Sequence, residues 1–171
     1  MGREEVMEEK VKNYILATSA YGGDGYESLS LHYTPEGQEA FENWLEGEPK
    51  VSGVTLYRGY NFERRYWEDG MVEEGSVIGV DQMTQGVDLP AFTLGPLRAV
   101  NYMNDFGDGV VLGDGQKVLF EVETTGRAFV DISRYSFYPK EDEHRCTRQA
   151  QLFVVSVKQK GGYLEVKCRE V

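Results

Sequence analysis

The chain has 171 residues, of which 40% are hydrophobic, and its 18 basic and 29 acidic side chains give a net charge of −11. This length corresponds to about one globular domain, and the negative charge disfavours binding to nucleic-acid phosphates. No apolar run approaches the ~18 residues of a membrane-spanning helix, and the first residues, MGREEVMEEKVK, lack the apolar region of a secretory signal. We therefore expect one domain over residues 1–171, a cytoplasmic location and no membrane partner.

Two helices are predicted in residues 1–50. Thr34 followed by Pro35 is typical of a helix N-cap and first helical position, and Gly47 is a typical stop. An earlier helix is predicted over residues 3–17. Apolar residues recur at helical spacing in both segments: Val6, Met7, Val11, Tyr14 and Ile15 in the first, and Ala40, Phe41, Trp44 and Leu45 in the second.

Strands dominate the rest of the chain, residues 51–171. The clearest is 117–123, where Val118, Phe120 and Val122 share one face and charged residues take the other. A short helix is expected to begin at Pro96. The other predicted strands are 54–60, 76–80, 127–132, 151–158 and 162–170. Helices followed by strands indicate an α+β fold.

Three short segments, in a fixed order, carry candidate chemistry. LYRG (56–59) puts an arginine near the end of a strand, PAFT (90–93) places a hydroxyl beside an aromatic residue, and YPKEDE (138–143) contains two glutamates one residue apart. Each has an ordinary structural interpretation, respectively a surface ion pair, strand packing and a solvated acidic loop. If 141–143 is a strand, Glu141 and Glu143 project to the same face and can share one site.

The order and spacing of these segments over residues 54–158 resemble the mono-ADP-ribosyltransferase family, in its Arg–Ser–Glu class with a Glu-x-Glu motif. The resemblance implies a core of two small packed β-sheets (51–171) preceded by a helical preamble (1–50). It implies transfer of ADP-ribose from NAD to a protein, with arginine as the expected acceptor residue. Members of this kind are bacterial toxins or effectors, or bacteriophage proteins, which act in the cytoplasm of the producing or target cell.

The resemblance also implies roles for individual residues. Glu143 matches the catalytic glutamate and Glu141 the glutamate that orients or deprotonates the acceptor, while Arg58 matches the NAD-binding arginine. These residues suit the reaction because breaking the nicotinamide–ribose bond develops positive charge that a carboxylate stabilises, and a guanidinium binds pyrophosphate. The remaining implied cofactor contacts are Gly59, Ala91, Phe92, Thr93 and Tyr102, with Phe106 as another candidate nicotinamide-side aromatic residue. The implied substrate loop contains Phe137 and Tyr138.

Two departures from the family pattern are visible in the sequence. Ala91 stands where the family prefers a serine that hydrogen-bonds the catalytic glutamate, although Thr93 keeps a hydroxyl. After the Glu-x-Glu motif the family favours an apolar residue, but here His144 and Arg145 follow.

The implied co-substrate is NAD, and neither a metal nor a disulfide is expected, since two cysteines and two histidines provide little material for either. Two alternatives remain open. One is an NAD glycohydrolase, in which water replaces the protein acceptor. The other is a catalytically weak binding module whose acidic surface blocks a basic partner. The target protein and the oligomeric state are not indicated by the sequence.

Overall fold

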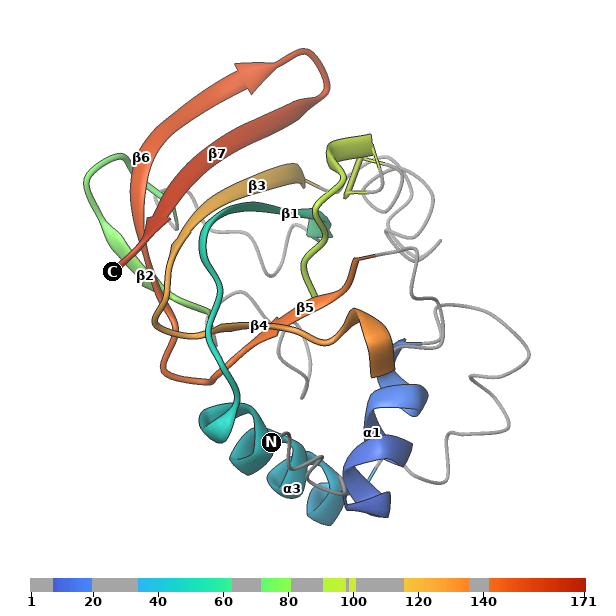
Figure 1. Cartoon of the computed structure of the whole chain (residues 1–171). Coiled ribbons are helices and arrows are strands. Elements are labelled where there is room, and N and C mark those ends of the chain that lie inside the picture. The colour runs from blue at the N-terminus through green and yellow to red at the C-terminus, as the bar shows by residue number, and fades with distance from the viewer. Residues whose placement is uncertain are drawn as a thin grey trace.

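The computed structural model describes residues 8–19, 34–62, 72–80, 91–97, 99–100, 116–135 and 142–171 (Figure 1). Its helices are α1 (Glu9–Ser19), α3 (Pro35–Gly47) and the 3₁₀ turn η4 (Ser133–Tyr135). Its strands are β1 (Ser52–Phe62), β2 (Val77–Gly79), β3 (Gln116–Thr125), β4 (Phe129–Asp131), β5 (His144–Cys146), β6 (Gln151–Lys160) and β7 (Tyr163–Glu170). The predicted α+β class is confirmed.

Helix α3 begins and ends as the sequence predicts. The Thr34 hydroxyl accepts a hydrogen bond from the Gly37 backbone N–H at 3.0 Å, a cap typically worth about 1 kcal/mol. At the other end, the Lys50 ammonium donates to the Leu45 and Glu48 carbonyl oxygens at 2.9 and 2.6 Å. These contacts satisfy backbone groups that have no partner within the helix.

Five strands form the larger sheet, in the order β1-β3-β7-β6-β2. Strands β3 and β7 run parallel, whereas β1 pairs antiparallel with β3 and β6 antiparallel with β7. Strands β6 and β7 form a hairpin, and Gly161 in its turn has a φ of 58°, which glycine adopts without a steric penalty.

The smaller sheet, β4 with β5, lies between the larger sheet and the helices (Figure 1). Its alternating side chains serve both layers. Phe129 and Cys146 belong to the core shared with the larger sheet, while Val130 packs with Phe41 and Leu45 of α3. The small sheet therefore has a neighbour on each face, which explains why its short strands are almost entirely buried.

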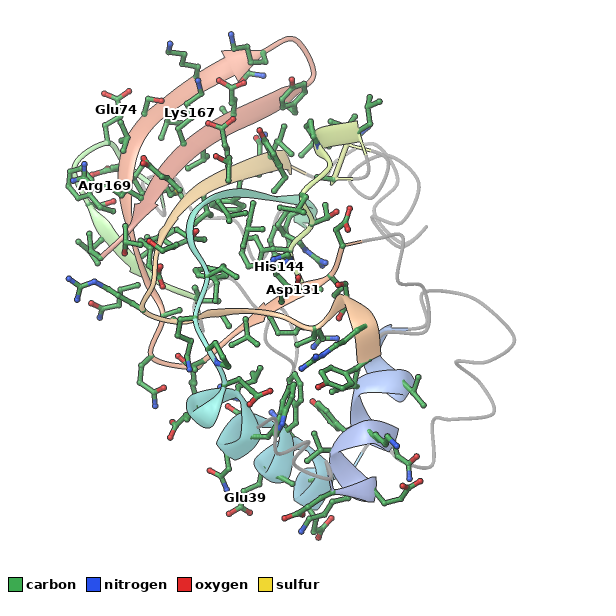
Figure 2. All side chains as sticks on the ribbon, viewed as in Figure 1. Glu39, Glu74, Asp131, His144, Lys167 and Arg169 are labelled. Atoms are coloured by element: carbon green, nitrogen blue, oxygen red, sulfur yellow. The ribbon has the colours of Figure 1, made fainter. Side chains whose placement is uncertain are left out.

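Figure 2 shows the result for polar side chains: Glu39, Glu74 and Lys167 point outward, whereas His144 lies inside the molecule. His144 is only 2% exposed.

Most predicted elements are present, with ends that differ by a few residues. The helix predicted over 3–17 is observed from Glu9 to Ser19, and its residues before 8 lie outside the described part of the chain. Pro96 does begin helical backbone. Strand β5 was not predicted as a strand over His144–Cys146. Within the described residues, no helix is both long and apolar enough to span a membrane.

Candidate active site

The segment Ala91–Thr93, referred to below as the central segment, joins the two sheets. Thr93 exchanges backbone hydrogen bonds with Tyr57 of β1 at 2.8 and 3.0 Å, and Phe92 exchanges two of 2.8 Å with His144 of β5. A three-residue segment thus has β1 on one side and β5 on the other. Residues 58 and 143, which are far apart in the sequence, are brought to the same segment.

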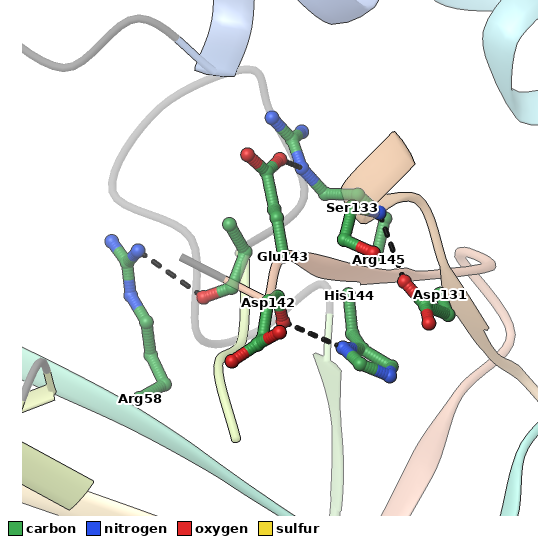
Figure 3. Close-up of polar contacts among 8 residues, drawn as sticks. Arg58, Asp131, Ser133, Asp142, Glu143, His144 and Arg145 are labelled. Atoms are coloured by element: carbon green, nitrogen blue, oxygen red, sulfur yellow. Dashed lines mark hydrogen bonds and ion pairs between the residues drawn. The ribbon is translucent and has the colours of Figure 1, made fainter. Parts of the chain in front are cut away.

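Arg58 lies on the face of β1 that looks toward the small sheet, because Leu56 and Tyr60 on the same face belong to the shared core. Its Nη1 donates to the Ala91 carbonyl oxygen at 3.2 Å, and its guanidinium carbon lies 4.7 Å from the centre of the Tyr60 ring. Both contacts fix the planar group near the central segment, and Figure 3 draws the first of them. The guanidinium is half-buried, which strengthens its interaction with an anionic ligand.

Gly59, the next residue of β1, is buried and pairs with Leu119 of β3. The three residues of the central segment are buried as well. Phe92 is 2% exposed, and its ring packs edge-on against Phe129 with ring centres 5.1 Å apart. The Phe92 side chain is therefore part of the core between the sheets. The Thr93 hydroxyl accepts a hydrogen bond from the Gly95 backbone N–H at 3.3 Å.

Glu143 immediately precedes β5 and makes a buried ion pair. Arg145 Nε donates to Glu143 Oε2 at 2.7 Å, and the two side chains are 3% and 2% exposed, respectively. The Arg145 guanidinium also lies over the Phe41 ring of α3, 5.6 Å from its centre. Figure 3 draws this ion pair together with the hydrogen bond from Arg58 to the Ala91 carbonyl oxygen.

The backbone turns just before Glu143, contrary to the strand premise of the sequence interpretation. Asp142 has a φ of 49°, in the left-handed region that few residues other than glycine occupy. His144 Nδ1 lies 2.8 Å from the Asp142 carbonyl oxygen, across this turn. Simple strand alternation therefore does not extend from Glu143 back through Asp142, and it is wrong as an argument for a shared face with Glu141.

Asp131 sits across the small sheet from His144. Partial burial opposes its ionisation, but hydrogen bonds from the side chain and backbone of Ser133, together with the positive charge of His144 and Arg134, lower its pKa below the ordinary value of 3.8. The bond from the Ser133 backbone N–H is 2.9 Å long. This carboxylate shapes the start of η4 rather than the segment around Glu143.

The structure thus brings together Arg58, Glu143 and the Ala91–Thr93 segment. Glu141, Tyr102, Phe106, Phe137 and Tyr138 lie outside the described residues. One residue of the site, Arg145, was missed by the sequence interpretation, although its signal was present as a charged residue where the family favours an apolar one. The described residues contain no group of three or more side chains able to hold a metal ion.

No protein-family model matches the chain, and no curated protein matches it in sequence. Its fold does match solved structures. Vis toxin, an ADP-ribosyltransferase from Vibrio splendidus, superposes with a TM-score of 0.66 at 16% identity, over 96% of this chain and 74% of that chain. Vis in complex with agmatine gives a TM-score of 0.58 at 19% identity, over 95% and 67% of the two chains.

A third match is exoenzyme S from Pseudomonas aeruginosa, in a complex with human 14-3-3 protein beta and bound to carba-NAD. It gives a TM-score of 0.55 at 18% identity, over 94% of this chain and 66% of that chain. The protein has the ADP-ribosyltransferase fold, which confirms the fold that the sequence resemblance implied. It spans about two thirds to three quarters of the length of these chains.

Proposed function

We propose that the protein is a mono-ADP-ribosyltransferase that transfers ADP-ribose from NAD to a protein acceptor and releases nicotinamide. One observation carries the proposal. Within the ADP-ribosyltransferase fold, a guanidinium from β1 and a carboxylate next to β5 flank the same buried segment, Ala91–Thr93. These are the two charged groups that cleavage of NAD requires.

In the proposed reaction, the bond between the ribose C1′ and the nicotinamide nitrogen breaks, and nicotinamide leaves with the bonding electron pair. Positive charge then develops on the ribose, where the Glu143 carboxylate stabilises it. Arg58 binds the pyrophosphate, for which a planar guanidinium offers two parallel hydrogen bonds. The acceptor attacks C1′ and loses its proton to the Glu141 carboxylate or to water. The Glu143 side chain is 2% exposed. The groups that cover its carboxylate must therefore move before the ribose of NAD can reach it.

We propose arginine as the acceptor residue and Glu141 as the group that orients it. The Glu-x-Glu spacing of residues 141 and 143 supports this choice. So does the agmatine in a Vis structure, because agmatine carries the same guanidine group as arginine. We further propose that the protein acts as a toxin or effector in the cytoplasm of the producing or target cell.

The test compares Glu143→Gln with Glu141→Gln, using labelled ADP-ribose on protein and free nicotinamide as separate readouts. Glu143→Gln should lose both transfer and NAD hydrolysis, by about 10²–10³-fold or more. Glu141→Gln should lose transfer to arginine but keep NAD hydrolysis, because water requires less orientation than a guanidine. Glu123→Gln, at an exposed position of β3, is the matched control and should keep both activities.

Glu143→Gln breaks the buried ion pair with Arg145, and loss of one partner of such a pair typically costs about 3–5 kcal/mol. The thermal midpoint must therefore be measured alongside the activity. The double variant Glu143→Gln/Arg145→Met removes both charges and should recover stability without recovering activity. Full activity in a folded Glu143→Gln protein would refute the proposed role of this carboxylate.

The same assay addresses two other candidates. Release of nicotinamide without labelled protein, over a range of acceptors, would identify an NAD glycohydrolase. A catalytically weak binding module is favoured by one observation, the enclosure of Glu143 in an ion pair. That candidate predicts NAD binding without turnover, together with partner capture that survives Glu143→Gln.

A further inference from the structure

Arg145 and Glu143 form an unusually constrained pair. They are two residues apart at the start of β5, and the Nε–Oε2 contact of 2.7 Å joins side chains that are 3% and 2% exposed. A hydrogen bond between charged groups in such a buried place is short, strong and directional. It therefore selects one orientation of the Glu143 carboxylate.

Arg145 is itself held from two directions. Its backbone lies opposite Val130 in the β4–β5 ladder, and its guanidinium lies over the Phe41 ring of α3, 5.6 Å from the ring centre. The arginine thus connects Glu143 to the small sheet and to the helical layer. A side chain anchored in this way can act as a rigid support for the carboxylate that it contacts.

Glu143 needs such a support because its own backbone does not aim it by strand geometry alone. The preceding residue, Asp142, has a φ of 49°, and β5 begins only at His144. The Glu143 backbone is tied down by its carbonyl oxygen, which accepts from the Ile132 N–H at 3.0 Å. The side chain beyond it has three rotatable bonds, whose freedom a backbone contact does not remove.

The central segment provides no hydroxyl at its first position. The Ala91 carbonyl oxygen accepts from Arg58. Thr93 uses its hydroxyl to accept from the Gly95 backbone. Strand β5 supplies a donor to Glu143 through Arg145.

We propose that Arg145 is a positioning residue for the reaction, which orients the Glu143 carboxylate toward the ribose of NAD. This proposal rests on the proposed function. Arg145 acts through Glu143 and does not itself contact NAD. It should therefore affect the rate of bond cleavage much more than the binding of NAD.

The test measures kcat and KM for NAD hydrolysis in Arg145→Met and Arg145→Lys. Arg145→Met should lower kcat by about 10²-fold, since a misplacement of about 1 Å has that effect, while KM for NAD changes less than threefold. Arg145→Lys should recover part of the loss, because an ammonium still donates to a carboxylate but lacks the planar fork. A fall in kcat with little change in KM, together with partial recovery in Arg145→Lys, distinguishes a positioning role of Arg145 from a general loss of structure.

Arg148→Met is the matched control. Arg148 Nε also contacts a glutamate oxygen, Glu42 Oε1, at 2.7 Å, but its side chain is 43% exposed. The kcat of Arg148→Met should equal that of the wild type. If Arg145→Met does not fold, Arg145→Lys carries the test, with an expected loss in kcat of about tenfold at a thermal midpoint that shows a folded protein.

The outcomes separate the two proposals. Absence of NAD turnover in the wild-type protein overturns the proposed function and this proposal with it. Turnover in the wild type together with an equal or higher kcat in a folded Arg145 variant overturns the positioning role alone. A fall in kcat with an equal rise in KM would place Arg145 in NAD binding, and it would also overturn the positioning role.

Discussion

Phe92 and His144 exchange two backbone hydrogen bonds of 2.8 Å each, across 52 positions of sequence. This pairing sets the distance between the central segment and β5, and hence between the Ala91 carbonyl that holds Arg58 and the residue that precedes His144, which is Glu143. Backbone pairing of this kind is rigid and insensitive to side-chain substitution. Main-chain pairing therefore sets where the backbones of Arg58 and Glu143 lie, and the proposed role of Arg145 is to orient the Glu143 carboxylate beyond its backbone.

Substitution of Arg58 by lysine should weaken NAD binding about tenfold or more. The variant keeps a positive charge but loses the planar fork that binds pyrophosphate and that donates to the Ala91 carbonyl at 3.2 Å. Isothermal titration with NAD measures the effect. Arg169→Lys is the matched control, because Arg169 also lies over an aromatic ring, Phe153, at 5.6 Å. Equal affinity in wild type and Arg58→Lys would return Arg58 to a structural role.

The substitution Thr124→Val should destabilise the protein by about 1–3 kcal/mol. The Thr124 hydroxyl donates to the Val54 carbonyl oxygen at 2.7 Å and accepts from the Val54 N–H at 3.0 Å, where the β1–β3 register shifts. Valine keeps the shape but leaves both backbone groups without this partner. Urea denaturation gives the change in free energy of unfolding. Thr55→Val, at an exposed neighbour in β1, should change it by less than about 0.5 kcal/mol.

Both thiols should be inert in the native protein. Burial, the largest cause, raises the pKa of Cys146 and of Cys168 to about 12. An unperturbed thiol has a pKa of about 8.5, so at pH 8 the native thiolate fraction is lower by about three orders of magnitude. A thiol-reactive chromogenic reagent should label neither cysteine at pH 8 and both in urea. Rapid labelling of one thiol in the folded protein would contradict the buried placement.

Stability should fall in acid partly because of Asp131. The folded pKa of Asp131 is lower than its ordinary value, so the charged carboxylate favours the native state. This contribution is fully present above the unfolded pKa, near 4, and is lost as the pH falls through the lower folded value. Asp131→Asn keeps an acceptor oxygen but loses the charge, so it should be less stable than the wild type at pH 6, by at most about 0.5 kcal/mol because solvent screens this exposed position. Urea denaturation at pH 6 and pH 3 should show the gap narrowing, and a constant gap would argue against this linkage.

Local sequence signals were sufficient for most of the fold. The Thr34–Pro35 pair predicted the start of α3, and the alternation around Val118 and Phe120 predicted β3, because capping and burial on one face act over a few residues. The motif order along the chain then indicated the ADP-ribosyltransferase fold and a site containing Arg58 and Glu143. Capping, alternation and motif order can all be recognised from neighbouring residues or from their order.

The elements that were missed depend on distant partners. Strand β5 contains His144 and Arg145, which do not resemble a buried strand until β4 and the central segment enclose them. The turn at Asp142 requires a left-handed backbone conformation, which aspartate can adopt but which an aspartate in a sequence does not by itself predict. The contact between Arg145 and Glu143 follows from both, so the sequence could show only that a charge stood in an unexpected position.

The central place of β7 in the larger sheet has a consequence for folding during synthesis. Strands β1 and β3 are made early, but β3 can be joined to β6 only through β7, and the contact from Thr125 to Glu170 spans 45 positions. Such long-range parallel pairing forms slowly. A nascent chain that still lacks β7 therefore has two separate strand pairs with unpaired edges, β1 with β3 and β6 with β2. A shortened chain that ends at Gly162 should lack the cooperative unfolding transition of the 171-residue chain.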